Sequence, residues 1–148
     1  MADVVFSHST EVSVRFAETD AQGIAHNASY LVWYVVARVD YLARFAGGYN
    51  RIRELGIEAL TIEAHVRYLG AVHFDDRLRI NVRCGDLGGA RFRFDYLIER
   101  VTQAGAEPVA DGWTLHATVD HESFRPTRLP DWLRESIEQA EARAAATR

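Results

Sequence analysis

The sequence feature that most constrains the fold is a run of twenty residues, Asn27–Ala46, with only three charged side chains. Its four valines favour a strand by propensity, but an uninterrupted run of this length is far longer than an ordinary strand. Asn27 is a residue type that caps helix N-termini, and Gly47 with Gly48 is a typical C-terminal stop. We therefore predict a helix over Asn27–Ala46, about 30 Å long. Because this helix is apolar on nearly all sides, we expect the rest of the chain to wrap around it.

Five segments alternate apolar and polar residues with the period that is typical of a strand buried on one face. Turn residues separate them, and the short spacing of the last three segments favours a meander. The segment 130–145 begins with Pro130 and has apolar residues at helical spacing, which predicts a C-terminal helix. This order predicts an α+β fold, with a five-stranded antiparallel sheet wrapped around one long central helix, plus the C-terminal helix. The predicted strands are 11–16, 60–68, 78–84, 92–98 and 113–119.

Length, charge and cysteine content narrow the class of protein. At 148 residues the chain can form one hydrophobic core, so we predict a single domain over residues 1–148. The formal net charge of -4 argues against nucleic acid or an anionic membrane as a partner. The longest uncharged apolar run, Ala28–Ala37, has about half the length that a membrane span needs, and Met1 is not followed by a secretion leader, so we expect a cytoplasmic protein. Cys84 is the only cysteine and the histidines lack metal-ligand spacing, so we expect neither a disulfide nor a metal site.

One loop, Glu18–Asn27, gathers acid, imidazole, carboxamide and glycine directly before the predicted helix. It contains the carboxylate of Asp20, the imidazole of His26, and Gly23, which allows the backbone to turn tightly. The N-terminus of a helix offers unpaired N–H groups and roughly half a positive charge. A carboxylate near such N–H groups is suited to reactions in which a carbonyl oxygen gains negative charge.

Three motifs lie in and beside this loop: V-R-F-x-E-T-D-x-x-G-I at Val14–Ile24, N-x-x-Y-L-x-W at Asn27–Trp33, and A-R at Ala37-Arg38. With these motifs the chain resembles the hotdog-fold acyl-CoA thioesterases, in the branch of 4-hydroxybenzoyl-CoA thioesterase and the Tol-Pal-associated thioesterases. The strand pattern extends the resemblance over most of the chain. Thioesterases of acyl carrier proteins with an N-x-H element place His four residues past the Asp, where this chain has Ile24.

The resemblance implies a hydrolase that converts an acyl-CoA thioester to the free acid and CoA. By position, Asp20 is the family's catalytic carboxylate, and the N–H of Asn27 at the start of the central helix polarises the thioester carbonyl. No cofactor is implied, since coenzyme A is part of the substrate. A homodimer or homotetramer is implied, in which two sheets pair edge to edge. Basic groups are expected to bind the CoA phosphates, and the residues expected to contact substrate are Gly23, His26, Tyr30 and Arg67.

Several alternatives remain open at this level. Asp20 can attack the thioester to give a mixed anhydride or act as a general base on water. We expect Glu18 to be a structural partner of an arginine such as Arg38 rather than a second catalytic acid. The rival functions are a non-catalytic acyl-CoA-binding module, against which the carboxylate of Asp20 argues, and a hotdog dehydratase or hydratase, against which the context of His73 argues. The sequence does not specify the acyl group. It also does not specify whether the acyl group is carried by CoA or by acyl carrier protein.

Overall fold

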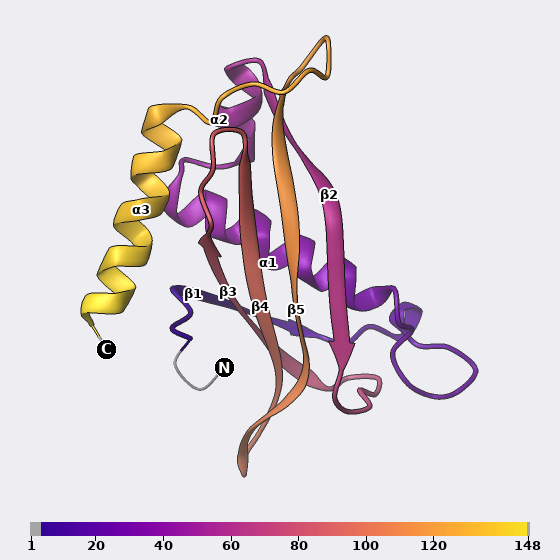
Figure 1. Cartoon of the computed structure of the whole chain (residues 1–148). Coiled ribbons are helices and arrows are strands. Elements are labelled where there is room, and N and C mark those ends of the chain that lie inside the picture. Colours follow the sequence, from indigo (N-terminus) through magenta and orange to yellow (C-terminus); the bar gives the residue numbers. More distant parts are fainter. Residues whose placement is uncertain (1–3, 148) are drawn as a thin grey trace.

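The computed structural model describes residues 4–147 and consists of one five-stranded antiparallel sheet with three α-helices and a short 3-10 helix (Figure 1). This is the α+β architecture predicted from the sequence. In chain order the elements are β1 (His8–Ser13), η1 (Phe16–Glu18), α1 (Ser29–Phe45), α2 (Tyr49–Glu54), β2 (Ile57–Tyr68), β3 (Arg77–Gly85), β4 (Arg91–Thr102), β5 (Gly105–Asp120) and α3 (Asp131–Ala146).

The strands lie in the order β1-β3-β4-β5-β2, all antiparallel. The predicted meander of the last three strands is therefore confirmed, and β1 and β2 form the two edges. The first strand ends at Ser13 rather than at Phe16, because Phe16–Glu18 turns into the 3-10 helix. The strand β5 begins at Gly105, several residues before the predicted start. The reason is that β4 and β5 form a hairpin that stays paired up to its turn, where Thr102 lies opposite Gly105.

Helix α1 is shorter than predicted: it has 17 residues, which corresponds to about 26 Å. Its N-cap is Ala28 rather than Asn27. His26 explains the later start, because its Nδ1 accepts the N–H of Ala28 at 3.1 Å and its carbonyl accepts the N–H of Ser29 at 2.9 Å. The polar turn that precedes the helix is therefore closed by His26, and Asn27 lies within that turn.

The sheet covers only one side of α1, which crosses it diagonally (Figure 1). The buried side carries large aromatic residues such as Trp33, Tyr34 and Tyr41, and the core lies between them and the inner faces of β3 and β4. The opposite side is exposed, so the expectation of a helix wrapped on most sides is wrong for the single chain. A single-layer sheet has no second layer with which to cover that side. The exposed side carries Leu31, Val32, Val35, Val36 and Val39, each 39–49% accessible.

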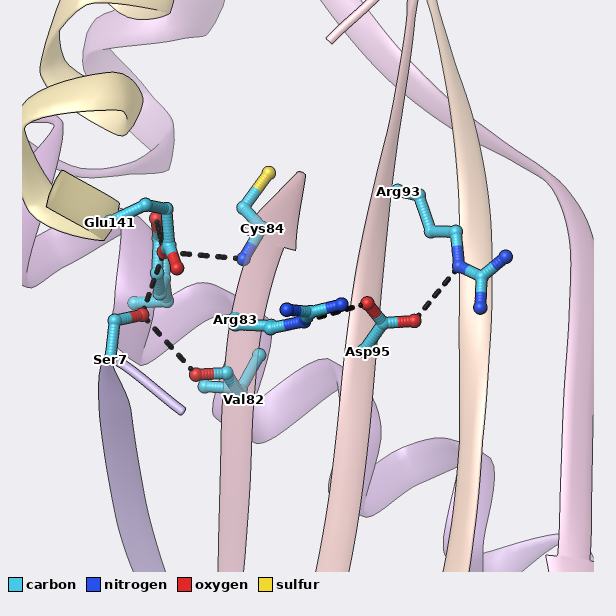
Figure 2. Close-up of polar contacts among 8 residues, drawn as sticks. Ser7, Val82, Arg83, Cys84, Arg93, Asp95 and Glu141 are labelled. Carbon is cyan, nitrogen blue, oxygen red and sulfur yellow. Dashed lines mark hydrogen bonds and ion pairs between the residues drawn. The ribbon is translucent and has the colours of Figure 1, made fainter. Parts of the chain in front are cut away.

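Helix α3 packs beside strand β3, and the carboxylate of Glu141 anchors it there (Figures 1 and 2). Its Oε2 accepts hydrogen bonds from the Ser7 hydroxyl at 2.7 Å, the Tyr41 hydroxyl at 2.6 Å and the backbone N–H of Cys84 at 3.3 Å. One side chain thus joins the N-terminal segment, α1, β3 and α3. No helix among residues 4–147 is long and apolar enough to cross a membrane.

Candidate active site

The loop between η1 and α1 folds as a small closed turn. Thr19 and Ala25 form an isolated antiparallel bridge, and the N–H of Asp20 donates to the Ile24 carbonyl at 3.1 Å. The N–H of Gly23 donates to the Asp20 carbonyl at 2.9 Å, and the backbone of Gly23 has a φ of +81°. Glycine adopts this left-handed conformation without a Cβ penalty. The turn holds Asp20 at the base of the loop, beside the segment that leads into α1.

Glu18 fixes the start of this loop from inside the protein. Its Oε1 accepts the backbone N–H of Arg15 at 2.8 Å, and its Oε2 accepts the indole N–H of Trp33 at 2.8 Å. Its backbone carbonyl accepts the N–H of His26 at 2.7 Å. The carboxylate of Glu18 also pairs with the guanidinium of Arg15 at 3.4 Å, so its arginine partner is Arg15 and not the expected Arg38. These contacts give Glu18 the structural role that the sequence suggested.

A cavity of about 610 Å³ opens beside the loop and the start of α1. It brings together four of the predicted site residues: Asp20, His26, Asn27 and Tyr30. Its remaining walls come from the same loop and from the end of β2 with the residues that follow it. These other lining residues are Gln22, Ile24, Ala25, Tyr68, Leu69, Gly70 and Ala71.

Hydrogen bonds orient the polar groups of this cavity. The carboxylate of Asp20 is half-buried, and its Oδ1 accepts the N–H of Gln22 at 2.8 Å. The carbonyl of Asn27 accepts the Tyr68 hydroxyl at 2.9 Å, whereas the N–H of Asn27 has no acceptor among residues 4–147. The rings of Tyr30 and Tyr68 meet edge to face at 4.9 Å, and burial raises the pKa of Tyr30. The cavity is therefore lined by an acid held by a backbone N–H, Asp20, and by Asn27, whose own N–H has no acceptor among residues 4–147.

Two predicted substrate contacts lie elsewhere. Gly23 shapes the turn but is not among the residues that line the cavity. Arg67 pairs with Asp111 through two hydrogen bonds of 3.0 and 2.6 Å and lies in a separate depression beside Trp113. The carboxylate of Asp111, on the neighbouring strand β5, thus neutralises the charge of Arg67. A contact of Arg67 with the CoA phosphates remains a prediction.

Tyr68 and the segment 69–71 were not singled out from the sequence, although they form one wall of the cavity. No local motif marks them, because their position depends on how the end of β2 meets the loop after η1. Within the described part of the chain, no group of three or more His, Cys, Asp or Glu residues is arranged to hold a metal ion.

Comparison with known proteins identifies the family. The family model described as the thioesterase-like superfamily matches residues 14–137, a span that includes the loop, α1 and the whole cavity. The chain belongs to the thioesterase-like superfamily. The comparisons do not single out the 4-hydroxybenzoyl-CoA and Tol-Pal branch of this superfamily.

Two sequence relatives and one solved structure illustrate the superfamily. The chain is 29% identical over 136 residues to the 1,4-dihydroxy-2-naphthoyl-CoA hydrolase of Thermosynechococcus vestitus, covering 88% of this chain and 91% of the relative. It is 24% identical over 119 residues to the acyl-CoA thioester hydrolase YbgC of Escherichia coli O157:H7, covering 80% of this chain and 87% of the relative. The DHNA-CoA thioesterase of Staphylococcus aureus superposes with a TM-score of 0.83 at 24% identity, covering 95% of this chain and 94% of that one, which shows a shared hotdog-type fold.

Proposed function

We propose that this protein hydrolyses acyl-CoA thioesters to the free acid and CoA in the cavity at the start of α1. The observation that carries the proposal is that Asp20 and Asn27 line one cavity of about 610 Å³, and that the N–H of Asn27 has no acceptor among residues 4–147. Relatives named as acyl-CoA hydrolases cover most of the chain and support the reaction class. Coenzyme A is part of the substrate, and we propose no cofactor.

The proposed chemistry assigns one role to each group. The N–H of Asn27 donates to the thioester carbonyl oxygen as that oxygen gains negative charge, close to the positive end of α1. The carboxylate of Asp20, oriented by the N–H of Gln22, either takes a proton from the attacking water or attacks the carbonyl carbon itself. In both cases the CoA thiolate leaves and is protonated, and one water is consumed overall.

Isotope labelling detects a nucleophilic Asp20 whose anhydride is hydrolysed at the aspartyl carbon. In a single turnover in ¹⁸O-labelled water with enzyme in excess, a nucleophilic Asp20 forms a mixed anhydride. If water then attacks the anhydride at the aspartyl carbon, the label appears in the Asp20 side chain. A general base leaves the protein unlabelled and puts the label only in the acid product, and so does an anhydride that water attacks at the acyl carbon, so only a labelled Asp20 is diagnostic. A multiple-turnover control reports the label in the product for either route.

We propose an aromatic acyl group as the substrate class. Of the two tyrosines that line the cavity, Tyr68 is 50% exposed and offers ring surface that suits a planar acyl group, and the buried ring of Tyr30 supports it from behind through their edge-to-face contact. A relative named as a 1,4-dihydroxy-2-naphthoyl-CoA hydrolase supports an aromatic acid. Membership of the 4-hydroxybenzoyl-CoA branch, which would also imply an aromatic acyl group, remains a prediction. The roles of His26 and Tyr30 as substrate contacts are part of this proposal.

We also propose that the protein is a homodimer or homotetramer. Strand β2 is an edge strand of twelve residues, and edge strands expose unpaired backbone groups. The exposed aliphatic side of α1 is an apolar surface of the kind that a second copy of the chain would bury. In sedimentation experiments we expect a dimer or tetramer, and we expect Val36→Asp to lower the assembly state. A stable, active monomer of the unaltered chain would contradict the proposal.

A panel of thioesters tests the reaction against its rivals. We expect release of the CoA thiol from aromatic acyl-CoAs, with slower release from short-chain and long-chain acyl-CoAs. Acyl groups carried on acyl carrier protein report the choice of carrier, and a β-hydroxyacyl-CoA reports dehydration. Binding of acyl-CoA without turnover of any substrate would favour the binding module and refute the proposed hydrolysis.

A further inference from the structure

A second cavity, of about 250 Å³, lies between α1, α2 and the inner face of the sheet. Its walls are largely apolar, with Val39 and Leu42 of α1 facing Phe92 and Phe94 of β4. Two basic side chains, Arg38 and His116, also line it. It shares no lining residue with the cavity that contains Asp20.

The two cavities are separated along α1 by a buried ring. Tyr30 lines the first cavity and Arg38 lines the second, and Tyr34 lies one turn from each on the same side of the helix. The ring of Tyr34 is fully buried and stacks on Tyr96 with the ring centroids 3.9 Å apart. The second cavity is therefore not an extension of the first.

A chain of hydrogen bonds leads from Arg38 into the sheet. Its Nη1 donates to the Tyr96 hydroxyl at 3.0 Å, Tyr96 bonds Thr114 at 2.7 Å, and Thr114 bonds Nε2 of His116 at 2.7 Å. A guanidinium can only donate, so the arrangement that satisfies every group has Tyr96 donating to Thr114 and Thr114 donating to Nε2. Nδ1 of His116 then carries the proton and donates to the Thr61 hydroxyl at 3.3 Å. His116 is thus held neutral, in agreement with burial, which lowers its pKa to about 3.

Among residues 4–147, the charge of Arg38 has no acid paired with it. No carboxylate oxygen of residues 4–147 forms an ion pair with its guanidinium, and the partner of its one side-chain hydrogen bond is a neutral phenol. Tyr49, which also lines the cavity, gives its hydroxyl to Glu58 at 2.6 Å. A half-buried cation among apolar walls is costly unless it is paired. The cavity thus has the charge and the surface of a site for an anion with an apolar body.

We propose that this second cavity binds a small carboxylic acid in its ionised form, with the carboxylate on Arg38 and the apolar body against Phe92 and Phe94. Arginine is well suited to this ligand, because its planar fork matches the two oxygens of a carboxylate. The volume of about 250 Å³ lies just below the range of sites for drug-sized ligands, so a body of one aromatic ring is the appropriate size. Binding at this site does not depend on hydrolysis in the first cavity.

Calorimetric titration with benzoate, and with benzamide as a neutral molecule of the same shape, tests the proposal. We expect the unaltered protein to bind benzoate more tightly than benzamide. Arg38→Gln should weaken benzoate binding by roughly 10- to 100-fold, because a charge-assisted pair is lost. The matched control Arg79→Gln removes an arginine that pairs with Glu99 on the other face of the sheet, and should leave the affinity unchanged.

A second variant keeps the test valid if Arg38→Gln does not fold. Ala59 lines the cavity, so Ala59→Phe fills the space without changing the charge, and we expect it to abolish benzoate binding. Equal affinity for benzoate and benzamide, undiminished binding by Arg38→Gln or Ala59→Phe, or no binding by the unaltered protein would each overturn the proposal. If the unaltered protein hydrolyses no thioester of the substrate panel, the proposed function is refuted. Benzoate binding in the second cavity is unaffected by that outcome.

Discussion

Replacing Glu18 with Gln should destabilise the protein although the two side chains have the same shape. Glu18 is 7% exposed, and its two oxygens each accept a different N–H at 2.8 Å, one from the backbone of Arg15 and one from the indole of Trp33. A carboxamide has one oxygen, so it can satisfy only one of these donors and turns its NH₂ group toward the other. Since Trp33 is 2% exposed, we expect the oxygen to face the indole and the N–H of Arg15 to be left unsatisfied.

The expected cost follows from these contacts. The hydrogen bond from the N–H of Arg15 is partly buried, and a donor left without a partner there costs about 1–3 kcal/mol. The lost ion pair with the Arg15 guanidinium adds little, because that side chain is 71% exposed and surface pairs are worth ~0–1 kcal/mol. We therefore expect the free energy of unfolding to fall by about 1–3 kcal/mol, measured by urea denaturation followed by circular dichroism.

A matched control is Glu138→Gln, an exposed carboxylate on α3, which should change the free energy of unfolding by less than ~0.5 kcal/mol. Equal stability of Glu18→Gln and the unaltered protein would refute the reasoning, because it would mean that the two N–H groups do not depend on a carboxylate.

The remaining predictions concern the cavity wall, two glycines and a buried histidine. Tyr68→Phe removes the hydroxyl that holds the Asn27 carbonyl at 2.9 Å, and the loss of one hydrogen bond of ~1 kcal/mol should lower kcat/KM about fivefold; an unchanged rate would show that this bond does not position the peptide. Gly112→Ala should prevent native folding, because its Cβ would lie 1.9 Å from a carbonyl oxygen of the facing strand. Gly23→Ala should lower the free energy of unfolding, measured by thermal unfolding, by only the ~1–2 kcal/mol that a left-handed backbone costs, because its Cβ would meet nothing within 4 Å. Equal effects of Gly112→Ala and Gly23→Ala would contradict this. Burial lowers the pKa of His116 from 6.5 to about 3, so the unfolded chain binds a proton that the folded protein excludes. The stability that this group contributes is present above pH ~6.5 and is lost as the pH falls toward ~3, at up to ~1.4 kcal/mol per pH unit. The urea midpoint of His116→Gln should therefore fall less steeply with decreasing pH than that of the unaltered protein. Identical slopes of the midpoint against pH would contradict the prediction.

The fold was predictable where it depends on local pattern, and less so where it depends on a partner surface. Alternation identified every strand of the sheet, and the apolar run identified α1. The start of α1 was misplaced because His26, rather than Asn27, caps the turn, and a histidine in that role has no strong sequence signal. The helix α2, Tyr49–Glu54, was not predicted, because six residues after paired glycines carry too little periodicity.

The candidate site divides in the same way. Asp20, His26 and Asn27 lie in one short loop, so a sequence motif could group them. The contact of Tyr68 with Asn27 and the pairing of Arg67 with Asp111 depend on where β2 lies and on its register with β5, in which Arg67 is directly opposite Asp111. A register between strands far apart in sequence is set by packing of the whole sheet, and no local pattern reveals it.

The central claim is that the carboxylate of Asp20 takes part in thioester hydrolysis, and the rate of the Asp20→Asn variant tests it most directly. Asp86→Asn, on an exposed turn residue with a φ of +50° that asparagine tolerates, is the matched control, and thermal unfolding of both variants verifies that they fold. With the best substrate of the thioester panel, we predict that Asp20→Asn lowers the rate of CoA release by roughly 10²- to 10⁴-fold while Asp86→Asn retains the full rate. A folded Asp20→Asn variant that releases CoA as fast as the unaltered protein would contradict the account.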